Sequence, residues 1–215
     1  MSTIIQGVLG GFSGKTGPVI GSSWRSRPVM RARPVYKKNR KFTQQQLDQQ
    51  EKFRLMSAFL HGVGDLLSTS FKTSDKQQSG ANAALAYNLR EAVAGLESPY
   101  SIDYAKIRLA QGPLAMAARP VVEPLAGSQV KLSWTYTPDI AKTKPSDIAI
   151  AVLYSDTSKQ FQFTATVSAI RSDGELTLDA PAYAGETVHV WFFFLSEDEG
   201  KACDSAYLGT VAVTV

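Results

Sequence analysis

The sequence has little cysteine, no long apolar run and, over its first 41 residues, no acidic side chain. Its single cysteine, Cys203, cannot form an intramolecular disulfide, so no disulfide framework stabilises the fold. The longest apolar run, residues 190–195, is far shorter than the roughly 18 residues that span a bilayer. The N-terminus lacks the basic region and apolar core of a conventional signal peptide. We therefore expect a protein made in the cytoplasm without a membrane span, while release by lysis or a specialised route stays open.

Catalytic and metal-binding signatures are also missing. The glycine-rich run at residues 10–16 is similar to a phosphate-binding loop, but its first glycine is one position too close and residues 17–18, Gly-Pro, prevent the helix that must follow. His61 and His189 belong to no metal-spaced cluster, and no serine lies in a nucleophile elbow. The acidic run 197–199 does not match a calcium-binding loop. We predict no enzyme, no catalytic residue, no metal site, no cofactor and no small-molecule substrate.

The charge is divided along the chain. The 215 residues carry a net charge of +4, yet residues 1–41 hold nine basic and no acidic side chains, which gives +9. Residues 42–124 hold eight of each sign, and residues 125–215 hold six basic and eleven acidic side chains, which gives −5. Opposite charges at the two ends of one chain indicate either self-complementary docking or an anionic partner for the basic end.

Residues 1–41 are predicted to form an extended basic arm. Its prolines each remove a backbone donor, and its glycines disfavour a free-standing helix. Between them lie short β-prone pieces, so we expect strands or wrapping segments that need a partner surface. Apolar and basic side chains alternate in the part that we predict to be the assembly arm: Val19, Ile20, Trp24, Arg25, Arg27, Val29, Met30, Arg31, Arg33, Val35 and Tyr36.

The sequence leaves three roles open for this arm. The apolar residues at intervals favour docking on protein, as an added strand on a neighbouring copy. Cations mixed with aromatic rings also suit phosphate neutralisation and base stacking, as in single-strand nucleic-acid binding. The third alternative is a solvated tail. The nucleic-acid alternative would use Trp24, Arg31, Arg33, Tyr36, Lys37, Lys38, Arg40 and Lys41.

Residues 42–120 are predicted to be a helical segment with one strand. Thr43 and Gln46 form a capping box at the start of a first helix, which Gly62 and Gly64 weaken or end. A second helix is predicted over residues 81–94, with Gly95 as its stop, and a strand over residues 102–109. The first helix places one apolar face inward: Phe53, Met56, Leu60, Val63 and Leu67. For the second helix the inward residues are Leu85, Leu89, Ala92 and Val93.

Residues 121–215 are predicted to form an antiparallel β-sandwich, so the fold class is α+β. Short alternating runs separated by turns predict strands over residues 130–136, 148–154, 161–170, 175–178, 188–195 and 207–215. The aromatic run Trp191–Phe194 suggests a sugar-binding platform, but a continuous apolar run is more typical of a central strand buried on both faces.

Several motifs together resemble a family of unknown function that is common in Bacteroidota. They are Gly14–Arg25, Met30–Pro34, Phe42–Phe53, Asn82–Leu89, Ile102–Ile107 and Gln111–Leu114. The resemblance implies that arm, helices and sandwich belong together, and that the sandwich is fibronectin type III-like or immunoglobulin-like. It implies no activity and supplies no catalytic residue.

The leading functional hypothesis is a non-enzymatic structural protein. Its arm docks on a neighbouring copy, and the resulting homo-oligomer is a filament, ring or particle. The first alternative is a nucleic-acid-binding protein with a phage-like or packaging role. The second is a surface adhesin or glycan-binding module that uses exposed aromatic residues of the sandwich.

Overall fold

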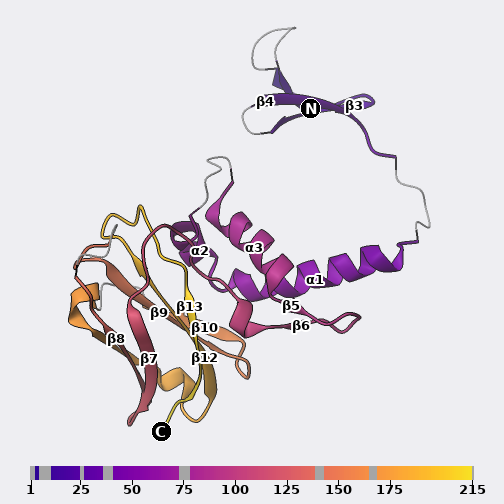
Figure 1. Ribbon diagram of the computed structural model, residues 1–215. Coiled ribbons are helices and arrows are strands. Elements are labelled where there is room, and N and C mark those ends of the chain that lie inside the picture. The colour runs from indigo at the N-terminus through magenta and orange to yellow at the C-terminus, as the bar shows by residue number, and fades with distance from the viewer. Residues whose placement is uncertain are drawn as a thin grey trace. The chain divides into compact units, whose positions relative to one another are not determined.

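The computed structural model describes residues 3–4, 11–24, 27–35, 41–72, 78–138, 143–164 and 169–214. The chain divides into two compact units, Met1–Gln44 and Gln45–Val215 (Figure 1).

The N-terminal unit is a four-stranded antiparallel sheet in the order β1-β2-β3-β4. Its strands are β1 (Thr3–Ile4), β2 (Phe12–Thr16), β3 (Val19–Trp24) and β4 (Arg27–Ala32). Gly17 has a φ of 56° in the turn between β2 and β3, a conformation that glycine adopts without steric cost. The predicted arm therefore pairs its short β-prone pieces with one another.

Over residues 41–72 and 78–120 the structure has three helices, where two were predicted. They are α1 (Gln44–His61), α2 (Gly64–Ser70) and α3 (Gly80–Glu91). The first predicted helix is divided at Gly62, as its glycines indicated, and continues as α2. Since α1 begins at Gln44, Thr43 occupies the position predicted for its cap.

The inward faces differ in part from the prediction. Met56, Leu60, Val63 and Leu67 are buried, but Phe53 is 49% exposed because the first turns of α1 extend beyond the core. In α3 the fully buried side chains are Ala84 and Asn88, while Leu85 and Leu89 are half-buried against the core. The helix ends at Glu91, so the prediction that it continues over residues 92–94 is wrong. Val93–Ala94 instead forms β5, which pairs with β6 (Ser101–Ile102).

The predicted strand over residues 102–109 is wrong beyond its first residue. A 3₁₀ helix, η1 (Tyr104–Lys106), follows β6, and the backbone after it bonds to side chains rather than to a sheet. Asn88 accepts from the Arg108 N–H and donates to the Arg108 carbonyl, each at 2.8 Å. Ser70 Oγ donates to the Leu109 carbonyl at 2.7 Å, and the Leu109 N–H donates to Ser205 Oγ at 2.9 Å. These bonds satisfy the backbone without a ladder.

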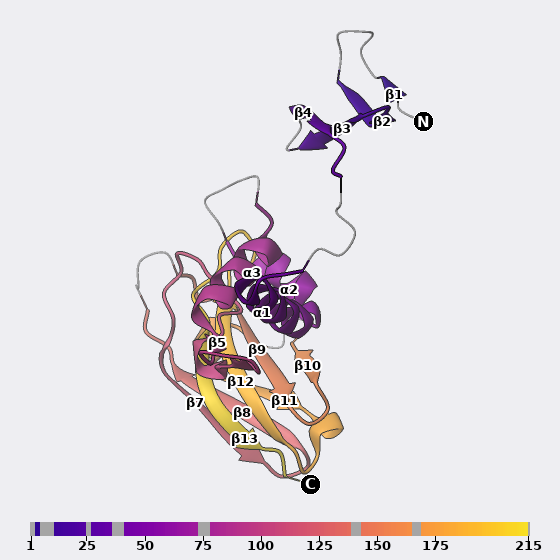
Figure 2. The same cartoon turned by 90° about the vertical axis from the view of Figure 1, so that its right-hand side faces the viewer.

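The rest of the C-terminal unit is a sandwich of two antiparallel sheets, in the orders β10-β9-β12-β13 and β11-β8-β7 (Figure 2). In the segment predicted as a strand over 161–170, residues 161–163 belong to a strand of the sheet and Ile170 forms an isolated antiparallel bridge with Ile148. Residues 165–168 lie outside the described residues, as does Val215. The strands are β7 (Ala118–Leu125), β8 (Gln129–Thr135), β9 (Ile148–Ser155), β10 (Gln160–Phe163), β11 (Glu175–Asp179), β12 (Thr187–Leu195) and β13 (Ala206–Ala212). Short 3₁₀ turns, η2 (Arg171–Asp173) and η3 (Pro181–Tyr183), flank β11.

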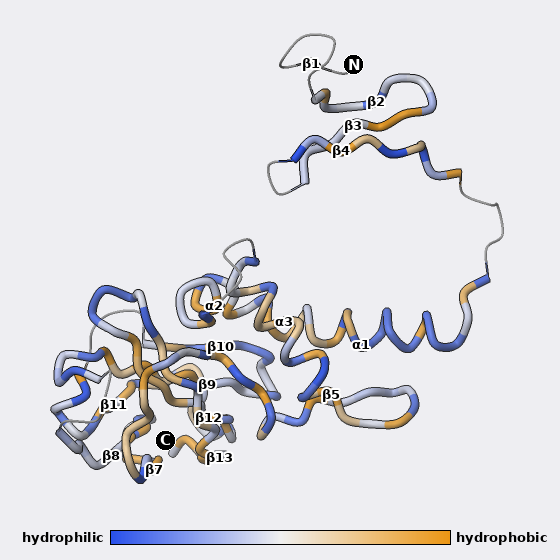
Figure 3. Tube along the Cα trace, turned by 45° about the horizontal axis from the view of Figure 1, so that its top comes forward, coloured by the Kyte–Doolittle hydropathy of each residue, from blue (hydrophilic) through white to orange (hydrophobic). Residues whose placement is uncertain are grey.

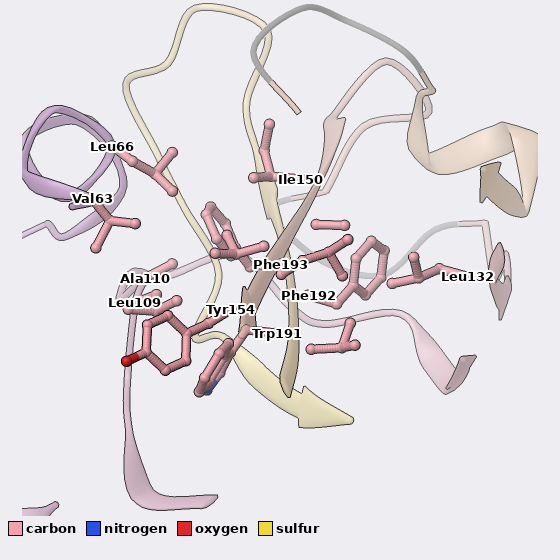
Figure 4. Close-up of a cluster of buried hydrophobic side chains, with 14 of the residues drawn as sticks. Val63, Leu66, Leu109, Ala110, Leu132, Ile150, Tyr154, Trp191, Phe192 and Phe193 are labelled. Carbon is pink, nitrogen blue, oxygen red and sulfur yellow. The ribbon is translucent and has the colours of Figure 1, made fainter. Parts of the chain in front are cut away.

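Strand β12 is buried on both faces, which confirms the prediction of a central strand. The Phe192 and Phe194 rings face the other sheet, with centroids 4.9 and 5.5 Å from that of Trp134 on β8. On the opposite face Trp191 lies 6.4 Å from Tyr104 of η1. Figure 4 shows Val63 and Leu66 of the helical segment on one side of the strand and Leu132 of β8 on the other. A sugar platform at residues 191–194 is therefore wrong, because these side chains are completely buried.

An ion pair lies inside the sandwich. Arg171 Nε donates to Asp147 Oδ2 at 3.0 Å, and the two side chains are 2% and 1% exposed. The guanidinium also donates to the Ala115 carbonyl and lies 3.9 Å from the centroid of the Phe194 ring. Because both charges are paired and hydrogen-bonded, their burial is tolerated; removing one would leave the other unpaired in a low dielectric.

We predict that Asp147→Ala lowers the free energy of unfolding by about 3–5 kcal/mol, because it leaves the Arg171 charge buried and unpaired. The double change Asp147→Leu with Arg171→Met should recover part of the loss, since it buries no charge. Urea denaturation checks both variants. The control is Glu175→Ala in the exposed Lys131–Glu175 pair, where the loss should be much smaller. Equal losses at the two pairs would contradict the expectation.

Candidate functional site

The strand register gives the N-terminal sheet one basic face. Residues that pair directly across an antiparallel sheet lie on the same face. Lys15 pairs with Ile20, which pairs with Arg31, and Trp24 pairs with Arg27. All the cationic side chains that the structure describes in these strands are therefore on one face, together with apolar ones. Figure 3 shows hydrophobic stretches in β3 and β4 and hydrophilic ones in β4. We call this set the basic face: Lys15, Ile20, Ser22, Trp24, Arg27, Val29 and Arg31.

The opposite face of this sheet carries no charge and is partly covered by the start of β2. A Cβ atom added at Gly21 would lie 2.6 Å from the Phe12 ring and 2.2 Å from the Phe12 carbonyl oxygen, so Phe12 crosses directly over Gly21. One added at Gly11 would lie 2.4 Å from Pro28 Cβ. Even so, Gly21 is the only buried residue among those of residues 11–24 and 27–35, and Met30 remains 70% exposed. The unit builds almost no core of its own.

The predicted arm residues are divided between the two faces. Ile20, Trp24, Arg27, Val29 and Arg31 meet on the basic face, whereas Val19 and Met30 lie on the other. Val19 and Ile20 are half-buried, and the other described members are exposed. Arg33 and Val35 follow β4, and Lys41 precedes α1. Arg25, Tyr36, Lys37, Lys38 and Arg40 lie outside the described residues.

A second candidate site is a groove in the C-terminal unit. It has a volume of about 530 Å³ and lies where the end of α1, β6 and η1 meet the β9–β10 hairpin. Its apolar wall is a cluster of packed rings. The centroid of the Phe59 ring lies 5.0 Å from the centroids of the Tyr154 and Phe161 rings, and those of Tyr104 and Tyr154 are 5.8 Å apart. Gly62 allows this packing, since a Cβ there would lie 2.8 Å from the Phe161 ring.

The rim of the groove is polar and charged. Asp156 Oδ1 accepts hydrogen bonds from Lys159 Nζ at 2.5 Å and from the Tyr104 hydroxyl at 2.7 Å. Oδ2 accepts none from any residue that the structure describes. Lys159 has a φ of 55°, a left-handed conformation that few side chains adopt. The rim thus presents a carboxylate oxygen with no partner among the described residues, beside an ammonium group and a phenol.

The hydrogen bonds fix the protonation of the rim at neutral pH. Those from Lys159 and then Tyr104 lower the pKa of Asp156. Burial, followed by the bond to Asp156, raises the pKa of Tyr104 well above its usual value. The bond to Asp156 raises the pKa of Lys159. The carboxylate is therefore ionised, the phenol is a hydrogen-bond donor, and the ammonium is charged.

No motif in the sequence indicates this groove. Tyr104 and Asp156 are 52 positions apart, and no motif joins them. Tyr104 falls in the segment wrongly predicted as a strand, and Asp156 in a turn. Only the topology of the sandwich and the cover of its sheet by the helical segment bring the two side chains together.

The remaining polar candidates are satisfied within the fold. His189 is half-buried: its Nδ1 lies 2.8 Å from the Tyr207 hydroxyl and its ring 3.9 Å from that of Tyr104. Burial lowers the pKa of His189. In the acidic turn Asp198 Oδ1 accepts from Ser196 Oγ and the Gly200 N–H. Across the described ranges no three His, Cys, Asp or Glu side chains are grouped to hold a metal ion, and no helix is long and apolar enough to cross a membrane.

Cys203 lies in the core rather than in a reactive position. It is fully buried, and its Sγ accepts from the Phe194 N–H at 3.0 Å. Burial raises the pKa of the Cys203 thiol to about 12. Since the thiolate is the nucleophile, this thiol is unreactive in the folded protein.

We predict that Cys203 contributes a pH-dependent part of the stability. The thiol stays neutral in the folded protein but ionises near pH 9 when unfolded, so its contribution is complete below pH 9 and is lost as pH rises toward 12. The stability difference between wild type and Cys203→Ala should therefore be smaller at about pH 10 than at about pH 7 in urea titrations. A difference that is constant or grows with pH would contradict the expectation.

A second prediction concerns the rim. Tyr104→Phe should raise the pKa of Asp156, because it removes a hydrogen bond to the ionised carboxylate, and Lys159→Met should raise it further, because that bond is the larger cause. Carboxyl ¹³C chemical shifts followed through an acid titration measure this pKa. The control is Lys52→Met, which removes a positive charge from a side chain that does not line the groove. It should leave the pKa of Asp156 unchanged. An unaltered pKa in both rim variants would contradict the assignment.

Comparison with known proteins gives one family. A model described as a family of unknown function (DUF6266) matches residues 11–209, which include most of the N-terminal sheet, the groove and the sandwich. No curated protein matches the chain.

Proposed function

The chain belongs to the DUF6266 family of unknown function, and we propose that it is a non-enzymatic structural protein that self-assembles. In this proposal the N-terminal sheet of one copy docks on the C-terminal unit of a neighbouring copy. The contact joins two different surfaces, so repetition produces a ring if it closes and a filament or larger particle if it does not.

The observation that carries this proposal is the missing second layer of the N-terminal sheet. A sheet is stable when one face packs on another element, and small isolated sheets are marginal in water. Within residues 11–24 and 27–35 only Gly21 is buried, while Met30 is 70% and Val35 92% exposed. A partner surface that covered these side chains would supply the layer that the unit lacks.

Charge complementarity supports a second copy of the chain as that partner. Residues 1–41 carry +9, and residues 125–215 carry −5. Lys15, Arg27 and Arg31 concentrate positive charge on one face of the sheet. Such a face is attracted to a negatively charged domain, which speeds encounter and fixes the orientation of docking.

We also infer that the sandwich is fibronectin type III-like. Its fourth strand, β10, pairs with β9, so one sheet has the order β11-β8-β7 and the other β10-β9-β12-β13. An immunoglobulin constant-type domain has its fourth strand in the opposite sheet. The strand order thus supports the fibronectin type III alternative, and the sequence resemblance supports an origin in Bacteroidota.

Nucleic-acid binding is the second candidate function. The alternation of cations with apolar side chains on the basic face, and the pairing of Trp24 with Arg27, favour it. Cations would neutralise phosphates while an aromatic ring stacks on a base. This role predicts affinity for single-stranded oligonucleotides that falls steeply with salt, and no dependence on a second copy.

We predict that the full-length protein is oligomeric at low salt and that deletion of residues 1–41 makes it monomeric. The deleted protein should still fold, because the core cluster of buried apolar side chains, as far as the structure describes it, begins at Met56. Arg27→Glu with Arg31→Glu should weaken association about tenfold or more, because it reverses two charges on the docking face. Light scattering coupled to gel filtration, and analytical ultracentrifugation, measure the mass.

The control is Arg90→Glu with Lys106→Glu, an equal change of net charge on exposed positions of the C-terminal unit. It should not lower the mass, because it makes the unit that accepts the basic face more acidic. A full-length protein that is monomeric at both low and high salt would overturn the proposal, as would equal effects of the two charge reversals. Oligonucleotide binding by the monomer would favour the second candidate instead.

A further inference from the structure

We infer that the groove beside α1 is a binding site for a neutral carbohydrate, either a single pyranose or the end of a glycan chain. The residues that would contact it are Tyr104, Asp156, Lys159 and Phe161. This inference is independent of the proposed self-assembly, since it uses neither the N-terminal sheet nor a second copy.

The size and rigidity of the groove suit a small ligand. Its volume of about 530 Å³ lies within the range of small-molecule sites. Its wall is held by buried side chains: Phe59 and Tyr154 are almost completely buried and meet edge to face at 5.0 Å. The Tyr104 ring packs on the His189 ring, with their centroids 3.9 Å apart. A ligand would therefore meet a preformed surface and would order little of the protein on binding.

The polar rim matches the hydroxyl groups of a sugar. Each hydroxyl both donates and accepts a hydrogen bond. Asp156 Oδ2 accepts no bond from the described residues, and the ammonium of Lys159, which carries three donors, lies 2.5 Å from the other oxygen of the same carboxylate. Two neighbouring hydroxyls could thus bond to an acceptor and a donor side by side. The half-buried Tyr104 and Phe161 rings offer apolar surface to the C–H groups of a pyranose.

The charge balance of the rim selects a neutral ligand. Asp156 and Lys159 compensate each other within one ion pair, so neither an anion nor a cation would find an excess of opposite charge. A phosphate at Lys159 would lie beside the Asp156 carboxylate, and an ammonium at Asp156 Oδ2 would lie beside the Lys159 ammonium, so either ion would meet a like charge. A neutral polyol meets no such repulsion, and it leaves this exposed ion pair in place.

The backbone of the β9–β10 turn maintains this arrangement. Lys159 adopts a left-handed conformation with a φ of 55°, which is strained for a residue other than glycine. In this conformation its side chain returns to Asp156, three positions earlier. Strained residues of this kind cluster at ligand sites, where the surrounding structure holds them in place.

Saturation-transfer NMR on the full chain tests the inference with methyl glycosides of glucose, galactose and mannose, and with N-acetylglucosamine, at millimolar concentration. At least one should receive saturation at its ring protons when the aromatic protons of the protein are irradiated. Asp156→Asn, which keeps the shape of the side chain, should weaken that binding about tenfold or more, as expected when a hydrogen bond to a charged group is lost. Tyr104→Phe should weaken it less, because the ring remains.

Glu175→Gln is the matched control, because Glu175 is the carboxylate of an exposed ion pair with Lys131 on the other sheet. It should bind as the wild type does. Circular dichroism and the dispersion of the proton spectrum verify that each variant is folded. Absence of saturation transfer to all the sugars, equal effects of Asp156→Asn and Glu175→Gln, or tighter binding of a hexose phosphate than of the neutral glycosides would each overturn the inference. Assembly of the protein can fail or succeed without altering any of these results.

Discussion

The burial of β12 on both faces is the constraint on which the C-terminal unit depends. Consecutive side chains from Trp191 to Phe194 are apolar, so neither face of their sheet can be left to water. Each of these side chains contributes about 1.5–3 kcal/mol when it is fully buried. The sheet of β7, β8 and β11 covers one face, and the helical segment covers the other (Figure 1). For this reason helices and sandwich form one compact unit, residues 45–215, rather than two.

The groove lies where the helical segment stops covering the sheet that contains β12. Strand β10 is short and lies at the edge of its sheet, where α1 comes to an end and β6 and η1 turn away. The apolar rings that meet there continue the core outward, and the turn after β9 adds Asp156 and Lys159 at the boundary with water. An edge strand needs protection from pairing with other chains, and a charged turn beside it also serves that purpose.

The sequence predicted the elements whose signals are local and failed where distant side chains decide. The aromatic run marked the central strand, and the glycines at 62 and 64 marked the break between α1 and α2. The segment 102–109 has strand-like residues, yet Asn88, Ser70 and Ser205 satisfy its backbone from elsewhere in the chain. No pattern within the segment carries that information. The same holds for the groove. It also holds for the basic face, which can be predicted only once the strand register of the N-terminal sheet is known.

The two candidate sites differ in the kind of charge that they present, and this separates their ligands. Lys15, Arg27 and Arg31 on the basic face are surplus cations, so that face gains from an acidic partner. In the groove Asp156 is already neutralised by Lys159, so a cationic sheet that docked there would meet the Lys159 ammonium beside the carboxylate. An acidic surface without such internal partners is the better acceptor. Docking and sugar binding are therefore expected on different surfaces, and one copy could carry both at once.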